Sequence, residues 1–205
     1  MNLQKSRIIF VTIICFFSNF LLASDWTLKK DKGGITVFTR DVPGSRFKEA
    51  KAEAEVNTSL AAALKVVEDI GSYHLWVPDI SEMKVLAKIS DNESIVYEHE
   101  HTMFLVQDRD CIIRVTKSKD SKTNISTLKI TSLPDYMPKR KGIVRLKKIT
   151  ASWTFIPNKD KGTVKITYQM YNEPGGHISA GLSNGYIVKR VFTMITNLEK
   201  MVQRP

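Results

Sequence analysis

The sequence predicts an α+β fold in which a curved antiparallel sheet wraps around one long C-terminal helix. Three observations predict it: many short strand-like runs separated by polar turns, one short helical pattern after the first two strands, and one long amphipathic pattern at the end of the chain. A twisted sheet and an amphipathic helix can each bury one apolar face against the other. We find no internal repeat and no linker, so we expect one domain after the N-terminal segment.

Two strands are predicted at the start of the domain. Residues 35–40 are rich in β-branched side chains and follow Gly33 and Gly34. Residues 47–56 alternate between apolar and charged side chains, which is typical of a strand with one wet face. The small alanines of this second strand leave room for an element packed above them.

A short helix follows, capped by Thr58 or Ser59 and stopped by Gly71. Its apolar positions recur at helical spacing: Leu60, Ala63, Leu64 and Val67. Residues 73–78 are rich in aromatic side chains, and we expect them to form a turn.

A meander of about six strands comes next, because strand-like runs alternate with polar turns. The predicted strands are residues 83–89, 94–101, 109–117, 124–132, 142–156 and 162–171.

The chain ends in a helix predicted over residues 183–203, a stretch that contains no proline. One apolar face is formed by Ile187, Val191, Met194, Leu198 and Met201. The opposite, polar side is expected to carry Lys189, Arg190, Asn197 and Lys200.

The N-terminal segment predicts secretion. Lys5 and Arg7 precede an almost unbroken apolar stretch over residues 8–22, and the small residue Ala23 follows. This pattern is typical of a signal peptide over residues 1–23, cleaved after Ala23 or Ser24, with residues 24–205 as the mature domain. The stretch is short for a spanning helix, and an uncleaved anchor is the alternative interpretation.

Cysteine usage agrees with a bacterial envelope protein. Of two cysteines, Cys15 lies in the predicted signal peptide, so Cys111 alone remains and no internal disulfide can form. Secreted eukaryotic domains more often carry disulfides. We therefore expect export through the inner membrane into the periplasm of a Gram-negative bacterium.

Composition narrows the class of partner. The chain is 42% hydrophobic and 25% charged, which is ordinary for a globular domain and excludes disorder or many membrane spans. A formal charge of +10 suggests nucleic acid or an anionic membrane surface, and secretion disfavours nucleic acid. The densest basic cluster is either a membrane-docking patch or a solvated hairpin: Lys139, Arg140, Lys141, Arg145, Lys147 and Lys148.

Eight short motifs occur in order along the chain. They are residues 34–40, 76–79, 107–110, 132–138, 144–145, 152–155, 167–169 and 173–179, followed by Asn184. Together with the order of strands and helices they resemble the START family, the lipid-transfer domains named after the steroidogenic acute regulatory protein. The chain departs from the family at Met103, Phe104 and Leu105, where a Pro-aromatic-Pro stretch is common.

The resemblance implies a helix-grip fold whose sheet and terminal helix enclose a hydrophobic tunnel for one lipid. It also implies a lid made of the terminal helix, residues 183–201, and the loop at residues 102–108. Burial of an acyl chain or sterol in such a tunnel is favoured by about 0.8 kcal/mol per CH₂. Phospholipid, fatty acid and sterol all fit this expectation; we expect no cofactor, and a monomer. For the apolar run that begins at Met103, the alternative is a loop packed on the core.

Arg109 is the first candidate for contact with a ligand. In a strand it shares a face with Cys111, Ile113 and Val115, while Asp110 and Ile112 lie on the opposite face. A buried guanidinium needs a partner, which Glu98 or Glu100 on the preceding strand could supply. In the family the matching arginine sits in the tunnel, is paired, and can meet a lipid's polar group. A purely structural ion pair is the alternative.

We expect the ligand site to draw on both the sheet and the helix. The predicted ligand-binding residues are Arg109, Glu98, Glu100, Phe104, Val106, Cys111, Ile113, Trp153, Tyr168, Asn184, Val191, Met194 and Ile195.

The sequence predicts neither a catalytic residue nor a metal site. His99 and His101 share a strand face, but no third ligand stands at a recognisable spacing. Cys111 lies in an aliphatic strand and is expected to be inert. No nucleophile elbow and no phosphate-binding glycine loop occur, so we expect a non-enzymatic protein.

Two alternatives stay open. Cyclases and aromatases have related helix-grip folds, and Arg109, a carboxylate and His99 or His101 could form a proton-transfer set. Such enzymes act in the cytoplasm, so the predicted secretion disfavours this interpretation. A structural partner in an envelope complex is the third possibility.

Overall fold

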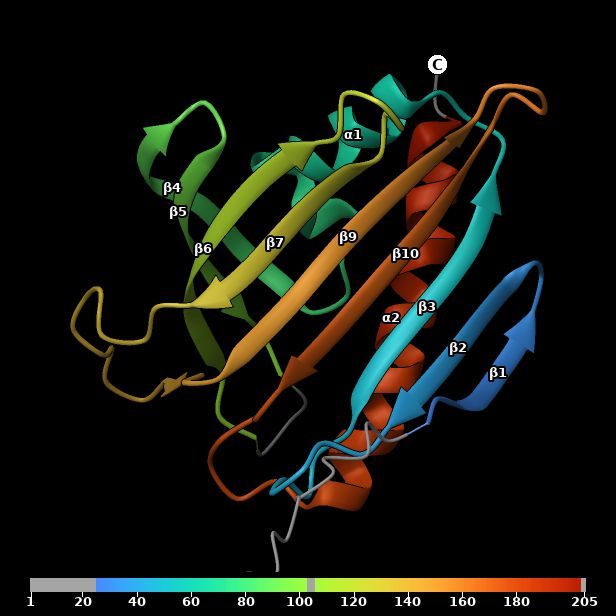
Figure 1. The fold of residues 1–205 in the computed structure, drawn as a ribbon. Coiled ribbons are helices and arrows are strands. Elements are labelled where there is room, and N and C mark those ends of the chain that lie inside the picture. Colours follow the sequence, from blue (N-terminus) through green and yellow to red (C-terminus); the bar gives the residue numbers. More distant parts are fainter. Residues whose placement is uncertain (1–24, 103–105, 204–205) are drawn as a thin grey trace, which may run out of the picture.

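The computed structural model describes residues 25–102 and 106–203, and within them ten strands form a single sheet (Figure 1). The strands are β1 (Thr27–Lys32), β2 (Ile35–Arg40), β3 (Glu49–Val56), β4 (Ile80–Ser90), β5 (Glu93–Glu100), β6 (Arg109–Lys119), β7 (Ser126–Ser132), β8 (Val144–Arg145), β9 (Ile149–Asn158) and β10 (Thr163–Asn172). Their order is β1-β2-β3-β10-β9-β7-β6-β5-β4, with antiparallel neighbours throughout. The short strand β8 pairs with β6 in parallel.

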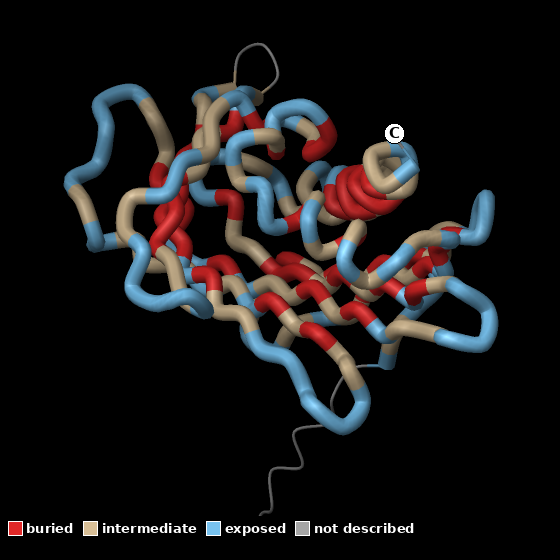
Figure 2. Tube along the Cα trace, turned by 90° about the horizontal axis from the view of Figure 1, so that it is seen from above, coloured by how far each residue is buried: buried red, intermediate tan, exposed pale blue. Residues whose placement is uncertain are grey.

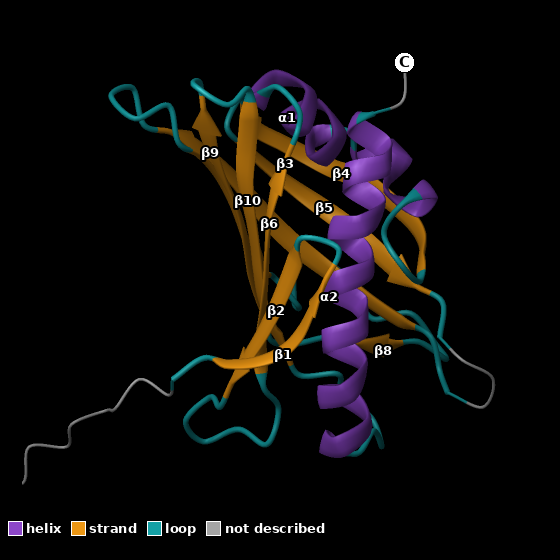
Figure 3. Cartoon of the chain, turned by 90° about the vertical axis from the view of Figure 1, so that its right-hand side faces the viewer, coloured by secondary structure: helices purple, strands orange, loops and turns teal. Residues whose placement is uncertain are grey.

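The sheet curves around the terminal helix α2 (Ala180–Val202), while α1 (Leu60–Glu68) and the 3₁₀ helix η1 (Ile70–Leu75) lie at one end (Figure 3). Ser59 and Ser179 cap the two α-helices, with each hydroxyl accepting a bond from the backbone three residues on. The predicted helix-grip architecture is confirmed. None of the described helices is long and apolar enough to span a membrane.

The core lies between the concave face of the sheet and α2 (Figure 2). The β3 alanines Ala50, Ala52 and Ala54 are buried there, and β3 packs against α2, as their small size predicted. The predicted apolar face of the helix is also buried, at Ile187, Val191, Met194 and Leu198. Spacing along the sequence was enough to predict which helix face packs on the sheet.

Aromatic side chains form the centre of this core. Trp153 on β9 lies with its ring centroid 4.3 Å from Tyr168 and 6.1 Å from Trp76. Trp76 and Trp153 are almost completely buried. The predicted aromatic turn therefore places η1 and the residue after it against the sheet.

Strand β1 was not predicted, because its side chains are mostly exposed and show no alternation. It is an edge strand, joined to β2 by Gly33 and Gly34, whose φ angles are 61° and 77°. Two glycines with positive φ are the usual requirement of a tight hairpin, so the signal was present in the sequence.

The single strand predicted over residues 142–156 is divided into β8 and β9. Residues 144–145 pair with β6 instead of continuing β9. The helix α2 also begins at Ala180, three residues before the predicted start. The division of the strand depends on pairing with β6, and the start of the helix depends on the cap at Ser179. The periodicity of apolar residues predicts neither.

The outer face of β6 is also partly buried. Ile112 is fully buried there and packs with Ile95 and Tyr97. Leu133 and Met137, from the segment that follows β7, pack against this second, smaller cluster. The alternation in β6 therefore separates two cores, rather than a core from solvent.

Candidate functional site

An outer chamber opens at the N-terminal end of α2. It holds about 830 Å³ of empty space, part of which is open to solvent. The first turns of α2 and the segments that follow β5 and β10 form its wall. Its lining residues are Asp79, Glu100, His101, Thr102, Val106, Arg109, Leu146, Met170, Asn172, Pro174, Ile178, Leu182, Ser183, Tyr186, Ile187 and Arg190.

An inner chamber lies deeper, between the concave sheet, α2 and the helices α1 and η1. It holds about 710 Å³ of empty space, counted in the same way. Most of its lining is apolar, with Leu128, Ile130, Ile149 and Ala151 on the sheet and Met194 on α2. Such a surface favours an acyl chain or a ring system over water.

The two chambers adjoin. Glu100, Leu146, Met170, Asn172 and Arg190 line both of them. We therefore treat them as two chambers of one cavity, and call the place where these five residues lie the junction.

The junction contains a buried ionic cluster. Arg190 Nη2 lies 2.5 Å from Glu100 Oε1 and 3.6 Å from Glu98 Oε1. The three side chains are only 9%, 12% and 14% exposed, respectively. Two carboxylates thus face one guanidinium, and the Arg190 Nε has no hydrogen-bond partner among the described residues.

Burial and mutual proximity shift the protonation of this cluster. Burial raises the pKa of Glu98 to about 8, and the neighbouring Glu100 adds to the effect. Burial alone would lower the pKa of Arg190, but Glu100 and Glu98 outweigh it and hold the pKa above its usual value. At neutral pH, Glu98 is therefore mostly protonated.

The prediction that Glu98 or Glu100 pairs with Arg109 was wrong. Glu100 is paired with Arg109 in the β5–β6 register, yet its carboxylate bonds Arg190. The Arg109 guanidinium instead donates to the backbone carbonyls of Gln107 and Pro174. Burial lowers the pKa of Arg109. The side chain still lines the outer chamber, as an interior position of β6 requires.

Arg190 was placed on the polar side of the helix, and this was also wrong. It follows Ile187 by three positions and precedes Met194 by four, so it lies on the apolar face. The spacing therefore contained the signal. An arginine was assigned to solvent because buried arginines are rare, and only the facing glutamates show why this one is tolerated.

The other predicted ligand residues divide between the cavity and its surroundings. Val106 lines the outer chamber, and the inner chamber is lined by Glu98, Ile113, Trp153, Tyr168 and Met194. Phe104 lies outside the described residues.

Four predicted positions do not line either chamber. Val191 and Ile195 are fully buried in helix packing, and Cys111 is a buried thiol whose pKa is raised by burial. Asn184 faces the β2–β3 connection, where its side chain accepts a bond from Lys48 N and donates to Arg46 O. It ties the start of α2 to the sheet.

Both histidines lie beside the carboxylate of Asp108, but only His101 lines the cavity. His99 is on the outer face of β5, with Nδ1 2.8 Å from Ser81 Oγ and Nε2 3.3 Å from Asp108. His101 lines the outer chamber and lies 3.2 Å from Asp108. The proton-transfer alternative thus retains His101 but not His99. No group of three or more potential metal ligands occurs within the described residues.

One member of the basic cluster is not a surface residue. Arg145 is buried and forms a two-point ion pair with Asp110, at 2.7 and 3.0 Å. It also donates to the carbonyls of Pro134 and Met137, and so holds the segment that covers the second core. It was wrong to assign Arg145 to a docking patch, although Lys139, Arg140, Lys141, Lys147 and Lys148 are exposed.

Comparisons with known proteins agree on one family. Residues 23–205 match the family model of the START domain. An uncharacterized protein of Pseudomonas aeruginosa is 31% identical over 184 residues, which cover 89% of each chain. A STAR-related lipid transfer protein from Xanthomonas axonopodis has a similar crystal structure, with 32% identity and a TM-score of 0.80 over 87% of this chain and 99% of that one.

A human structure shares the fold at greater distance. The lipid transfer and protein localization domain of human StarD13 is 19% identical, with a TM-score of 0.77 over 89% of this chain and 91% of that one. At this identity the likeness concerns the fold alone.

Proposed function

The chain belongs to the START domain family, and we propose that it binds one amphiphilic lipid in its divided cavity and carries it within the cell envelope. The observation that carries the proposal is the inner chamber, a buried and largely apolar space that adjoins one ionic cluster. An apolar body fits the chamber, and a polar group can meet hydrogen-bonding side chains at the junction. The lipid transfer protein of Xanthomonas axonopodis supports this choice by its name and its 32% identity.

The mouth of the cavity suits exchange with a membrane. Leu182 and Tyr186 on the first turns of α2 line the outer chamber and are 52% and 39% exposed. Exposing apolar side chains at a cavity rim costs less free energy when they contact lipid than when they contact water. We propose that α2 and the loop at residues 102–108 form the lid that opens here; residues 103–105 of this loop lie outside the described residues.

The exposed lysines provide a second contact with the membrane. Lys148 lies beside the mouth, since its carbonyl accepts a bond from Glu173 N, and the adjacent Pro174 lines the outer chamber. Lys139, Arg140, Lys141 and Lys147 are exposed as well. Each basic residue near an anionic surface contributes roughly 1 kcal/mol to binding.

We further propose that the protein acts without catalysis and in the periplasm. Residues 1–23, the predicted signal peptide, lie outside the described residues. Fractionation of the native cells and the mass of the purified protein test the location. A periplasmic protein that begins at residue 24 or 25 would support it, and a cytoplasmic protein of full length would refute it.

Native mass spectrometry of the protein purified from its own envelope, followed by lipid extraction, tests the binding function. We expect an added mass that resolves to one lipid class. Ala151→Leu places a larger side chain in the inner chamber and is expected to reduce the added mass, because it narrows the space open to a lipid. Thr150→Leu is the matched control, since it adds a similar side chain at the next, exposed position of β9.

Protein that stays empty after incubation with membrane extract would refute the proposal. An added mass that persists unchanged in Ala151→Leu would place the lipid elsewhere. Thermal unfolding of both variants shows whether the fold is retained, and filling a cavity is expected to keep or raise stability.

A further inference from the structure

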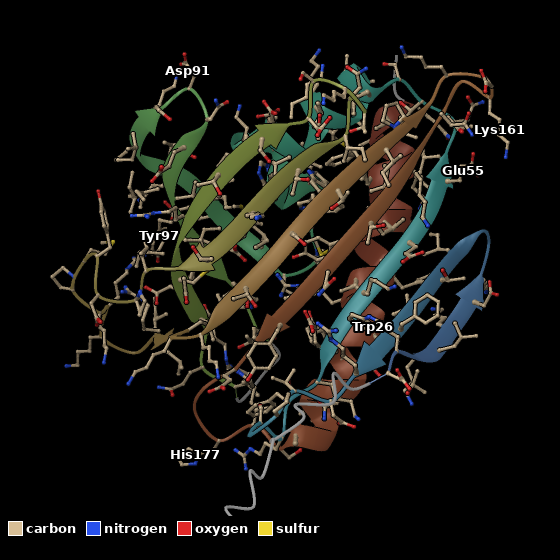
Figure 4. The ribbon with its side chains drawn as sticks, in the orientation of Figure 1. Trp26, Glu55, Asp91, Tyr97, Lys161 and His177 are labelled. Atoms are coloured by element: carbon tan, nitrogen blue, oxygen red, sulfur yellow. The ribbon has the colours of Figure 1, made fainter. Side chains whose placement is uncertain are left out.

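Three of the four histidines of the chain lie around the mouth of the outer chamber. His101 lines that chamber, and His99 and His101 lie 3.3 Å and 3.2 Å from the carboxylate of Asp108. His177 is exposed in the segment that leads into α2 (Figure 4), directly before Ile178, which lines the chamber. Histidine changes its charge between pH 5 and pH 8, so the charge of the mouth depends on pH in this range.

The permanent charges that face these histidines cancel among the described residues. Most belong to ion pairs between β4, β5, β6, β8, α2 and the segment after β10: Glu82–Lys84, Glu100–Arg190, Asp110–Arg145 and Glu173–Lys148. Two carboxyl groups and two cations remain: Asp79, Asp108, Arg109 and Lys189. The mouth therefore has no permanent excess of either sign at neutral pH, and protonated histidines decide its charge in acid.

Asp108 keeps its charge while the two neighbouring histidines gain theirs. Thr102 N donates a hydrogen bond to this carboxylate at 3.1 Å and lowers the pKa of Asp108. Mild acid thus leaves one carboxylate beside two protonated imidazoles, which are attracted to it. The arrangement of the cluster is retained while the mouth becomes positive.

The positive charge would arise beside the apolar rim of the cavity. Leu182 and Tyr186 are exposed and line the same chamber as His101. A surface that combines apolar side chains with positive charge fits an anionic membrane. The exposed lysines differ from this surface, because they carry their charge at every pH between 5 and 8.

We propose that His101 and His177, with His99 behind them, make the contact between the mouth and an anionic membrane dependent on pH, weak at pH 7.5 and strong near pH 5.5. The inference rests on the proposed function, because it concerns the step at which the same cavity meets a membrane. An anionic surface concentrates protons roughly threefold, so approach to the membrane itself favours the charged histidines. The lysines hold the protein at the surface at any pH, and the histidines bring the mouth to it.

Cosedimentation with vesicles at pH 5.5 and pH 7.5 tests the proposal. The vesicles contain phosphatidylglycerol and phosphatidylcholine at constant ionic strength, because the charges of these two lipids do not change over this range. We expect the protein to bind about tenfold more tightly at pH 5.5, since each added positive charge near the surface contributes about fivefold and not every histidine is fully protonated. Equal affinities at the two pH values would overturn the proposal.

Two variants locate the effect at the mouth. The double variant His101→Gln, His177→Gln should bind like the wild type at pH 7.5 and lose most of the gain at pH 5.5. His74→Gln is the matched control, because His74 is exposed on η1, close to Trp76, whose carbonyl accepts a bond from Asn197 in the C-terminal half of α2. It should keep the full gain. An undiminished gain in the double variant, or its loss in His74→Gln, would overturn the assignment.

Vesicles of phosphatidylcholine alone separate the effect of charge from that of unfolding. The gain in acid should be absent on them, because they have no net charge to attract the histidines. A gain of equal size on these vesicles would mean that acid exposes apolar surface, and would overturn the proposal. Native mass spectrometry tests the proposed function separately: bound lipid together with pH-independent vesicle binding refutes only the present inference, whereas protein that never carries lipid refutes the proposed function.

Discussion

Glu98 is expected to make the protein less stable as the pH rises through neutrality, and its replacement by glutamine should remove this effect. The carboxyl group lies in the inner chamber wall, 3.6 Å from Arg190, with Glu100 as a second acid on the same strand. Burial, with the neighbouring Glu100 as the second cause, raises its pKa from 4.5 to about 8. The folded state thus holds a proton that the unfolded chain releases.

The sign and the size follow from proton linkage. Below pH 4.5 the carboxyl is protonated in both states, so it contributes no pH dependence. Between pH 4.5 and about 8 the unfolded chain binds fewer protons, and the free energy of unfolding falls by about 1.4 kcal/mol per pH unit. Between pH 5 and pH 7 the loss amounts to about 3 kcal/mol.

Urea unfolding of the wild type and Glu98→Gln from pH 5 to pH 9 measures the difference. We expect the variant to gain about 3 kcal/mol relative to the wild type between pH 5 and pH 7, and the difference to level off above pH 8. Glutamine keeps the shape and an oxygen that can face Arg190, so packing changes little. A difference that stays constant across the whole range would refute the assignment of a raised pKa to Glu98.

Glu55→Gln supplies the control, because Glu55 lies on the outer face of β3 and away from the cavity (Figure 4). Glu55 is exposed, and a hydrogen bond from Thr163 lowers its pKa. A lowered pKa stabilises the folded state at higher pH, so this variant should lose relative stability as the pH rises, the opposite direction to Glu98→Gln. Two substitutions of the same type with opposite slopes would exclude a general effect of removing negative charge.

Three further outcomes are expected. Arg145→Met leaves Asp110 as an unpaired buried carboxylate and should lower the free energy of unfolding in urea by about 3–5 kcal/mol. Arg145→Met combined with Asp110→Leu should recover most of this loss. Equal losses in the single and the double variant would mean that the broken ion pair is not the cause. Ser179→Ala removes the hydroxyl that caps α2 and should lower stability by about 1 kcal/mol, measured by thermal unfolding. Ser118→Ala, at an exposed position of β6, should have little effect. The double variant Lys139→Glu, Lys141→Glu should cosediment less with anionic vesicles at low salt, because each lost positive charge removes roughly 1 kcal/mol of binding free energy. Its binding to uncharged vesicles should not change. Unchanged cosedimentation with anionic vesicles would mean that this segment does not contact the membrane.

Much of the fold could be predicted because the periodicity of apolar residues indicates which face of each strand or helix packs on the core. Alternation along residues 47–56 indicated a strand, and its alanines indicated a close neighbour, which is α2. The spacing from Ile187 to Leu198 predicted the buried face of that helix. Strand β1 lacks such a pattern because an exposed edge strand buries no alternating face.

The site was predicted less completely because partners across the cavity are far apart in sequence. The interior face of β6 was correctly predicted to carry Arg109, and the carboxylates of β5 were correctly expected nearby. The partner of Glu100 was missed, since Arg190 is ninety positions away on another element. The same reason hid the pair of Arg145 and Asp110 inside a run of basic residues.

The sequence by itself determined the order of elements, the buried helix face and the strand that carries an interior arginine, because these depend on neighbours within a few residues. Only the tertiary structure decided which charges compensate each other and how the cavity is divided. Sheet curvature brings the β5 glutamates within reach of the Arg190 side chain on α2, and their partners are decided by reach and burial rather than by strand register. The ionic cluster at the junction of the two chambers therefore follows from packing that no local pattern encodes.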